Sequence, residues 1–182
     1  TLHESMIRMI GLEAKAARSG KEARIIIKVN SLIDPESIDA LYAASQAGVR
    51  IDLIVRGICG LKPGVKGLSE NITIRSLLGR FLEHSRIYHF QNAPKQQRTY
   101  LGSADWMPRN FFRRVEVAFP IEEEEQEARV IEKLEGYLKD NEFATELKGN
   151  GRYLKIARRN RKPFSIQERL IDESVEESER EE

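Results

Sequence analysis

The sequence predicts an α/β fold in which helices cover both faces of a mixed β-sheet. Two runs, Ala23–Val29 and Val49–Val55, are short, apolar and rich in β-branched residues, as is typical of strands buried on both faces. The segment between them has the spacing of a helix, so strand, helix and strand follow within about 30 residues. Such a βαβ unit requires its two strands to be parallel. Further strand-like runs come later, and we expect an α/β/α sandwich.

The helices are predicted from apolar spacing and from their end signals. His3–Ala17 carries apolar residues three and four apart, which indicates an amphipathic helix. Asp34-Pro35-Glu36 begins the second helix, with an acidic N-cap, a proline at the first position and an acid in the first turn. Gly48 is suited to end that helix. A later helix is expected over Glu122–Leu138, where four acids favour the N-terminus.

The remaining strands are expected after a long loop. Ile58–Glu70 is rich in glycine, proline and lysine, which is typical of a loop. Strand-like runs then follow at Asn71–Leu77, Arg86–Phe90, Thr99–Gly102 and Arg114–Phe119.

Length and charge predict one folded domain with a tail. We place the domain at residues 1–150 and a basic, then acidic, partly disordered tail at residues 151–182, with a short helix at Ser165–Ile171. The net charge of +1 gives the whole chain no general attraction to nucleic acid. The single Cys59 excludes an internal disulfide and favours a reducing compartment. No apolar run is long enough to span a membrane.

The segment Glu83–Gln91 is the most informative stretch. His84 and Arg86 are two residues apart, and on a strand such side chains share a face, so we expect both in one site with Tyr88 beyond them. An arginine offers phosphate a two-pronged fork, and a histidine exchanges a proton near neutral pH. The pair therefore indicates phosphoryl or phosphodiester chemistry.

The other histidines are interpreted as structural. A lone histidine in a strand is more often structural than catalytic, but Arg86 and a neighbouring Gly102-Ser103 turn favour a functional His84. His89 lies at odd spacing from His84 and should point to the opposite face. We expect His3 on the surface of the first helix.

Arginines extend the predicted anion site. Arg56 follows the second parallel strand, where ligands gather in α/β sheets, although an arginine simply leaving a strand into solvent is an equal alternative. Arg109, Arg113 and Arg114 lie close together and would repel one another unless an anion or Glu116 compensates. Surface arginines paired with local acids are the alternative here. We expect Trp106 in the core.

Other reaction classes lack their motifs. The sequence has no zinc-ligand spacing, no Walker loop and no Gly-x-Ser-x-Gly elbow, and no histidine near Cys59 in sequence could activate it as a nucleophile.

The site residues resemble the phospholipase D superfamily. His84-x-Arg86 followed by Gly102-Ser103-x-Asp105 is similar to that superfamily's His-x-Lys-x4-Asp and Gly-Ser-x-Asn pattern. Three positions depart from it: Arg86 replaces lysine, Gln91 stands where the aspartate would be, and Asp105 replaces asparagine. The resemblance implies a phospholipase-D-like α/β/α sandwich with a mixed sheet.

A closer resemblance covers roughly residues 4–160. Asp52-Leu-Ile-Val-Arg56-Gly-Ile-Cys59, Arg80-Phe-Leu-Glu-His84-Ser-Arg86 and Ser103-Ala-Asp-Trp-Met-Pro-Arg109-Asn110 are similar to the last domain of the bacterial polyphosphate kinase family. Ile27-Lys-Val-Asn30-Ser-Leu-Ile-Asp34 fits the same family.

The kinase resemblance implies reversible transfer of the terminal phosphate of ATP to inorganic polyphosphate through a phosphohistidine. That histidine would lie in a preceding domain absent from this chain, so the isolated fragment should be inactive. The resemblance implies that His84 is catalytic and contacts nucleotide phosphates together with Arg56. We hypothesise that Arg56, Arg86, Arg109 and Arg114 form a cationic wall supported by Ser103, Asp105 and Glu116.

The same resemblance implies cofactors, partners and a compartment. Mg²⁺ is expected as cofactor, with ligands mainly outside this fragment and no metal site within it. ATP or ADP, polyphosphate and the remaining domains of a full-length, homo-oligomeric chain are the expected partners, with no nucleic acid. The expected location is the cytoplasm, or the inner face of the membrane.

Two alternatives remain. One is a phospholipase-D-like phosphodiesterase or nuclease that dimerises to bring two His84 motifs together. The other is a polyanion-binding module that uses the basic segment Lys148–Lys162.

Overall fold

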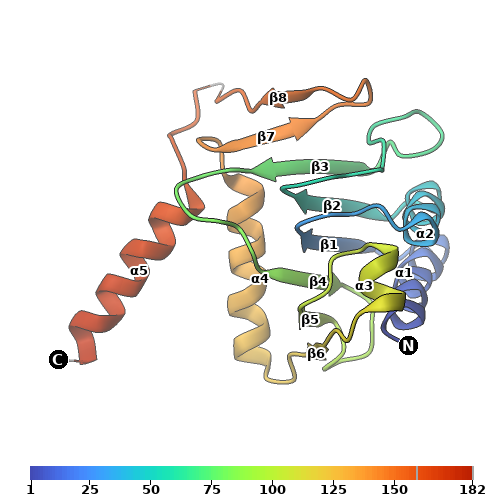
Figure 1. Cartoon of the computed structure of the whole chain (residues 1–182), viewed down its shortest axis with the longest axis horizontal. Coiled ribbons are helices and arrows are strands. Elements are labelled where there is room, and N and C mark those ends of the chain that lie inside the picture. The colour runs from blue at the N-terminus through green and yellow to red at the C-terminus, as the bar shows by residue number, and fades with distance from the viewer. Residues whose placement is uncertain (159, 182) are drawn as a thin grey trace.

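The computed structural model describes residues 1–158 and 160–181, in which eight strands form one sheet (Figure 1). Their spatial order is β6-β5-β4-β1-β2-β3-β7-β8. β1, β2 and β3 are parallel, whereas every other neighbouring pair is antiparallel, so the predicted mixed sheet is confirmed. The bounds are β1 Arg24–Val29, β2 Arg50–Val55, β3 Ile72–Leu77, β4 Arg86–Phe90, β5 Thr99–Gly102, β6 Ala118–Pro120, β7 Ala144–Leu147 and β8 Tyr153–Lys155.

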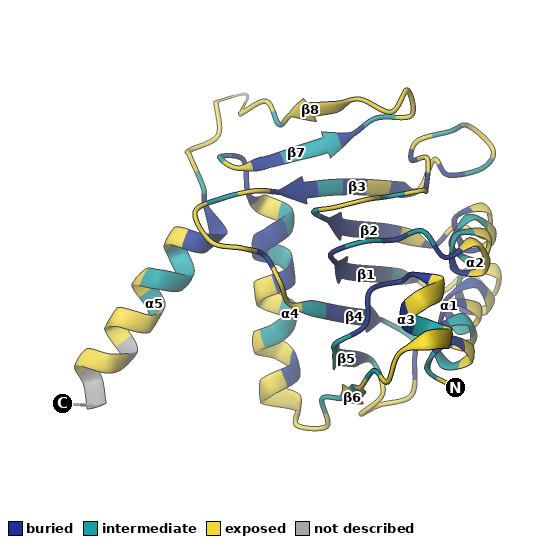
Figure 2. Cartoon of the chain, in the orientation of Figure 1, coloured by how far each residue is buried: buried dark blue, intermediate teal, exposed yellow. Residues whose placement is uncertain are grey.

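Helices cover both faces of this sheet. Met6 and Met9 of α1 pack with Ile25 and Ile27 on one face, together with residues of α2. On the other face Ile26 packs against residues of α4 and α5. Figure 2 shows that the central strands between these layers are largely buried. The α/β/α sandwich is therefore confirmed. The helices are α1 Leu2–Arg18, α2 Pro35–Gln46, α3 Pro108–Arg113, α4 Glu124–Lys139 and α5 Ile166–Glu181.

The predicted helix starts agree with the capping contacts. Asp34 is the N-cap of α2, where its carboxylate accepts a hydrogen bond from the Ser37 backbone N–H at 2.9 Å, and Pro35 occupies the first position. Gly48 follows the helix with a φ of +99°, a conformation that favours glycine. Of the helices in the described residues, none has the length and apolar character that crossing a membrane requires.

His3 corrects one prediction, because it is buried rather than on the surface. Its Nε2 lies 3.0 Å from Oδ2 of Asp34, and its ring packs against the rings of Phe111 and Phe112. The histidine thus joins α1 to the start of α2 and to α3.

The predicted strand Arg114–Phe119 is shortened to β6. Its partner β5 ends at Gly102, so residues before Ala118 have no strand beside them to pair with. The residues just before this segment form α3, a helix of six residues that was not among the predicted elements.

The region after residue 150 is more regular than the sequence predicted. β8 pairs with β7 across a turn in which Gly151 has a φ of +82°, so this hairpin extends the sheet beyond the expected boundary. The short helix expected at Ser165–Ile171 is the start of α5, which continues to Glu181 through the segment predicted to be partly disordered. Figure 1 shows α5 running away from the sheet.

His89, predicted to be structural, is buried on β4, and its Nδ1 lies 2.8 Å from the Thr99 hydroxyl. The same hydroxyl donates its proton to Glu127 at 2.8 Å. It must therefore accept from His89, and we assign the ring proton of His89 to Nδ1. Burial lowers the pKa of His89 to about 4, against the smaller opposing effect of Glu127.

The pKa of His89 predicts acid sensitivity. Unfolded His89 takes up a proton below pH of about 6.5, whereas the folded form resists protonation until about pH 4. The stabilisation is therefore complete above pH of about 6.5 and is lost as the pH falls, by about 3 kcal/mol at pH 4. Urea unfolding at pH 7.5, 5.5 and 4.5 measures the free energy of unfolding at each pH. In His89→Asn this free energy should fall less steeply between pH 7.5 and 4.5 than in the wild type. If the free energy of unfolding of the variant depends on pH as it does in the wild type, His89 is not the cause of the acid sensitivity.

Candidate phosphate-binding site at the carboxyl edge of the sheet

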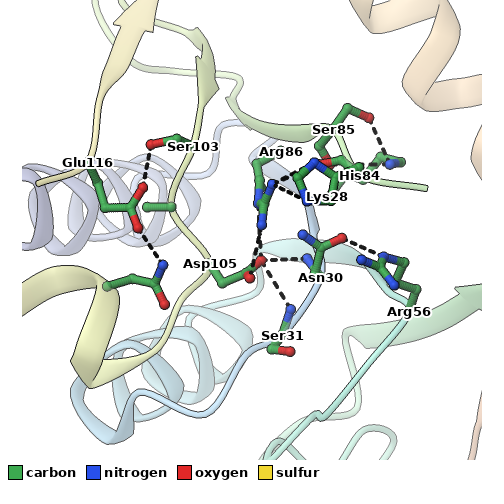
Figure 3. Close-up of polar contacts among 12 residues, drawn as sticks. Lys28, Asn30, Ser31, Arg56, His84, Ser85, Arg86, Ser103, Asp105 and Glu116 are labelled. Carbon is green, nitrogen blue, oxygen red and sulfur yellow. Dashed lines mark hydrogen bonds and ion pairs between the residues drawn. The ribbon is translucent and has the colours of Figure 1, made fainter. Parts of the chain in front are cut away.

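The predicted site residues gather at one edge of the sheet. Asn30 follows β1 and Arg56 follows β2, so both lie at the carboxyl ends of parallel strands, where ligands of α/β proteins bind. β4 is antiparallel to β1 and therefore begins at this same edge with Arg86. Asp105 follows the end of β5, the strand that pairs Gly102 with Arg86. Figure 3 shows these side chains around one centre.

Asp105 is the structural hub of this edge. Its Oδ1 accepts hydrogen bonds from the backbone N–H of Asn30 at 2.7 Å and of Ser31 at 3.3 Å. Its Oδ2 accepts from Nη2 of Arg86 at 3.2 Å, and Nε of the same guanidinium lies 3.3 Å from Oδ1 (Figure 3). One carboxylate thus joins the turn after β1 to the start of β4. The predicted supporting role of Asp105 fits this geometry.

Arg86 also contacts His84. Its Nη1 donates to the carbonyl of His84 at 3.0 Å and lies 3.2 Å from Nδ1 and 3.3 Å from Nε2 of the same residue. Because Nη1 is almost equidistant from both ring nitrogens, this contact does not select one tautomer. The imidazole is exposed. His84 is therefore placed beside a guanidinium and open to a ligand.

The placement of His84 corrects the strand prediction. β4 begins at Arg86, so His84 lies in the preceding loop and not on the strand. The Ser85 carbonyl accepts a hydrogen bond from Nζ of Lys28 instead of a strand neighbour. Tyr88, predicted to lie in the site, is buried, and its hydroxyl donates to the Ala104 carbonyl at 2.5 Å.

Arg56 is held beside the same centre by Asn30. Its Nε donates to Oδ1 of Asn30 at 2.5 Å. The Nδ2 group of Asn30 is buried and finds no hydrogen-bond partner among the described residues. The amide therefore holds Arg56 with its oxygen, while its two N–H donors have no partner among the described residues.

Lys28 belongs to this edge of the sheet but was not among the predicted site residues. Its side chain is 2% exposed, and its Nζ lies 3.0 Å from Oε2 of Glu83 and 2.8 Å from Oγ of Ser85. Burial lowers the pKa of Lys28 and Glu83 raises it, while Arg56 and Arg86 lower it further through like-charge repulsion. The available signal was a lysine at an inward position of an otherwise apolar strand.

Ser103 and Glu116 form a separate contact beside the centre. The Ser103 hydroxyl donates to Oε2 of Glu116, and Nδ2 of Asn110 donates to Oε1 at 2.6 Å. The backbone N–H of Val117 donates to the Ser103 hydroxyl at 3.0 Å. This group ties the end of β5 to the start of β6.

Arg109 and Arg114 are not brought into the cluster. Both are exposed, one on α3 and one directly after it. Within residues 1–158 and 160–181, neither makes a hydrogen bond or ion pair to Arg86, Asp105 or His84. Trp106 is fully buried, as predicted.

The described residues do not form a metal site by themselves. In the described part of the chain, no group of three or more His, Cys, Asp or Glu side chains could hold a metal ion. Asp105 is already engaged by Arg86 and two backbone N–H groups, and Glu116 by Ser103 and Asn110. No step of this chain is therefore assigned to Mg²⁺.

Comparison with protein families identifies the chain. Residues 1–167 match the model described as polyphosphate kinase C-terminal domain 2. The chain belongs to this family. Polyphosphate kinases of Paraburkholderia phytofirmans and Burkholderia multivorans are 57% and 58% identical to it over 154 residues. Those residues are 84% of this chain and 22% of each relative, so the chain spans about a fifth of the length of these relatives.

A solved structure agrees with this family. The crystal structure of polyphosphate kinase from Porphyromonas gingivalis matches with a TM-score of 0.91 and 36% sequence identity, over 97% of this chain and 27% of that one. The nuclease Nuc of Salmonella typhimurium, described as a phospholipase D family member, matches with a TM-score of 0.49 and 15% identity over 79% of this chain.

Proposed function

We propose that this domain binds the phosphates of ATP and polyphosphate in a polyphosphate kinase, opposite a histidine that another domain supplies. The observation that carries the proposal is the convergence of Lys28, Arg56 and Arg86 beside an exposed His84. The acids at this edge, Glu83 and Asp105, already bind Lys28 and Arg86. A phosphate would therefore relieve the remaining repulsion among the cations.

The chemistry assigned to this domain is positioning and charge neutralisation. In the forward reaction, a histidine nitrogen outside this chain attacks the γ-phosphorus of ATP, and the bond from that phosphorus to the β,γ-bridging oxygen breaks. Arg56 and the Asn30 amide would bind phosphate oxygens. His84 would hydrogen-bond the transferring phosphoryl group or protonate the leaving oxygen. ATP and ADP are abundant in the cytoplasm, which we propose as the compartment.

Arg56 provides the first test. Arg56→Ala in the full-length kinase should raise the KM for ATP roughly tenfold or more, because a charge-assisted hydrogen bond to phosphate is lost. The turnover number at saturating ATP should change much less. Arg18→Ala removes a cation at the far end of α1 and serves as the matched control. An ATP KM equal to that of the wild type would remove Arg56 from the nucleotide site.

The polyanion-binding alternative has less support. In the predicted basic segment, Lys148 pairs with Glu146 and Arg158 pairs with Glu142. Arg161 donates to the backbone carbonyls of Ala157 and Arg158. These cations are therefore used within the fold.

The phosphodiesterase alternative is tested separately. Hydrolysis of bis-p-nitrophenyl phosphate by this chain alone, lost in His84→Ala, would favour the phosphodiesterase over the kinase.

A further inference from the structure

The loop that carries His84 needs an external support. It connects β3 to β4, and its large apolar side chains are exposed to solvent: Leu78 is 67% exposed, Phe81 51% and Leu82 70%. Apolar burial therefore contributes little to holding these residues in one conformation. Whatever positions His84 must do so through specific contacts.

Gln167 in the first turn of α5 makes three hydrogen bonds to this loop. Its Oε1 accepts from the Phe81 backbone N–H at 3.0 Å, and its Nε2 donates to the Phe81 carbonyl at 2.9 Å. The same Nε2 donates to Oε1 of Glu83 at 2.6 Å. Gln167 is 5% exposed, so these contacts are shielded from water.

The contacts continue to the neighbours of His84. Glu83 binds Gln167 with one carboxylate oxygen and Lys28 with the other, at 3.0 Å. Lys28 also donates to the hydroxyl of Ser85 at 2.8 Å and to its carbonyl at 3.2 Å. The residues on both sides of His84 are therefore tied to β1 directly and to α5 through Gln167.

The start of α5 is itself closely docked. The Ile166 backbone N–H donates to Oδ2 of Asp140 at 3.0 Å, and a Cβ added to Gly136 would lie 2.3 Å from Cδ1 of Ile166. A Cβ added to Gly79 would lie 2.4 Å from Oε1 of Gln167. Farther along, a hollow of about 740 Å³ separates α5 from the loop. The support is thus concentrated in the first turn of α5.

We propose that Gln167 is a positioning residue that, together with Glu83 and Lys28, holds the loop so that His84 faces the phosphates. The C-terminal helix would thereby support the catalytic edge from the opposite side of the loop. This inference deepens the proposed function and rests on it for the role of His84. The support of the loop does not depend on that function.

The test uses Gln167→Leu in the full-length kinase, with two readouts. Hydrogen exchange at the Phe81 amide should accelerate roughly tenfold or more, because its acceptor is removed. The turnover number should fall roughly tenfold or more while the ATP KM changes little, since a small misplacement of His84 acts on the chemical step.

Two further variants separate positioning from general stability. Leu41→Ala removes a fully buried side chain of α2 on the other face of the sheet, so it should lower the unfolding temperature with little effect on turnover or on the Phe81 amide. Gln167→Glu places a carboxylate against Glu83 and should behave like Gln167→Leu or worse.

The outcomes are distinguishable. Unchanged exchange at Phe81 in Gln167→Leu would overturn the support of the loop, whatever the activity. Faster exchange with wild-type turnover would overturn the positioning of His84. If the wild-type protein forms no polyphosphate from ATP, the proposed function fails, while the exchange measurement still decides whether Gln167 holds the loop.

Discussion

Replacing His84 by alanine in the full-length kinase should lower turnover by about 100-fold or more. The side chain is exposed at the cationic edge, beside the Arg86 guanidinium, where it can meet a phosphoryl group. Proton donation or hydrogen bonding by a positioned histidine is typically worth about 10²–10⁴ in rate. Because the interaction forms chiefly in the transition state, the turnover number should fall more than ATP affinity does.

The measurement is the initial rate of polyphosphate formation from ATP at saturating substrate. His84→Gln retains an N–H donor without the titratable ring, and its rate should fall between wild type and His84→Ala if proton transfer contributes. His89→Asn at pH 7.5 is the matched control, since His89 lies on the face of β4 opposite Arg86 and its side chain contacts Thr99. Near-wild-type turnover in His84→Ala would remove the residue from the mechanism.

Replacing Asp105 by alanine should destabilise this domain by about 3–5 kcal/mol. The Arg86 guanidinium is 13% exposed in its side chain, and its only acidic partner in the described residues would be gone. The backbone N–H of Asn30 would also lose its acceptor. The same change should abolish activity, because Arg86 would no longer be held beside His84.

Urea unfolding of this chain measures the effect of Asp105. The double variant Asp105→Ala with Arg86→Met should lose less stability than the sum of the two single variants, because no buried charge is left unpaired. Glu124→Ala removes an exposed acid that pairs with Lys95 and should leave the free energy of unfolding nearly unchanged. A loss of less than about 1 kcal/mol in Asp105→Ala would show that the carboxylate is not the hub of this edge.

The parts of the fold that the sequence predicted are those with strong local signals. β1 and β2 are continuous β-branched runs, and Asp34-Pro35 marks the start of α2, so pattern alone was enough. The missed elements lack such signals. β8 has only three residues, all exposed, and forms because β7 lies beside it. α3 has six residues and no side-chain cap.

The predicted site residues also differ in how well the sequence placed them. Arg56 and Asp105 follow strands whose ends meet at one edge, so their residue types and the expected topology brought them together. Arg109 and Arg114 look similar in sequence, yet they lie exposed on and after α3, without a polar contact to the cluster in the described residues. Their part in a cationic wall therefore stays a prediction.

From its sequence alone, this chain can be given a mixed α/β/α sandwich and a candidate phosphate site on His84, Arg56 and Arg86, because residue chemistry and periodicity are local properties. Only the tertiary structure decided how these groups are held. The contacts of Asp105 with Asn30 and of Lys28 with Glu83 and Ser85 join residues far apart in the chain. So does the contact of Gln167 with Phe81, because hydrogen bonds form between groups that folding brings together, whatever their separation in sequence.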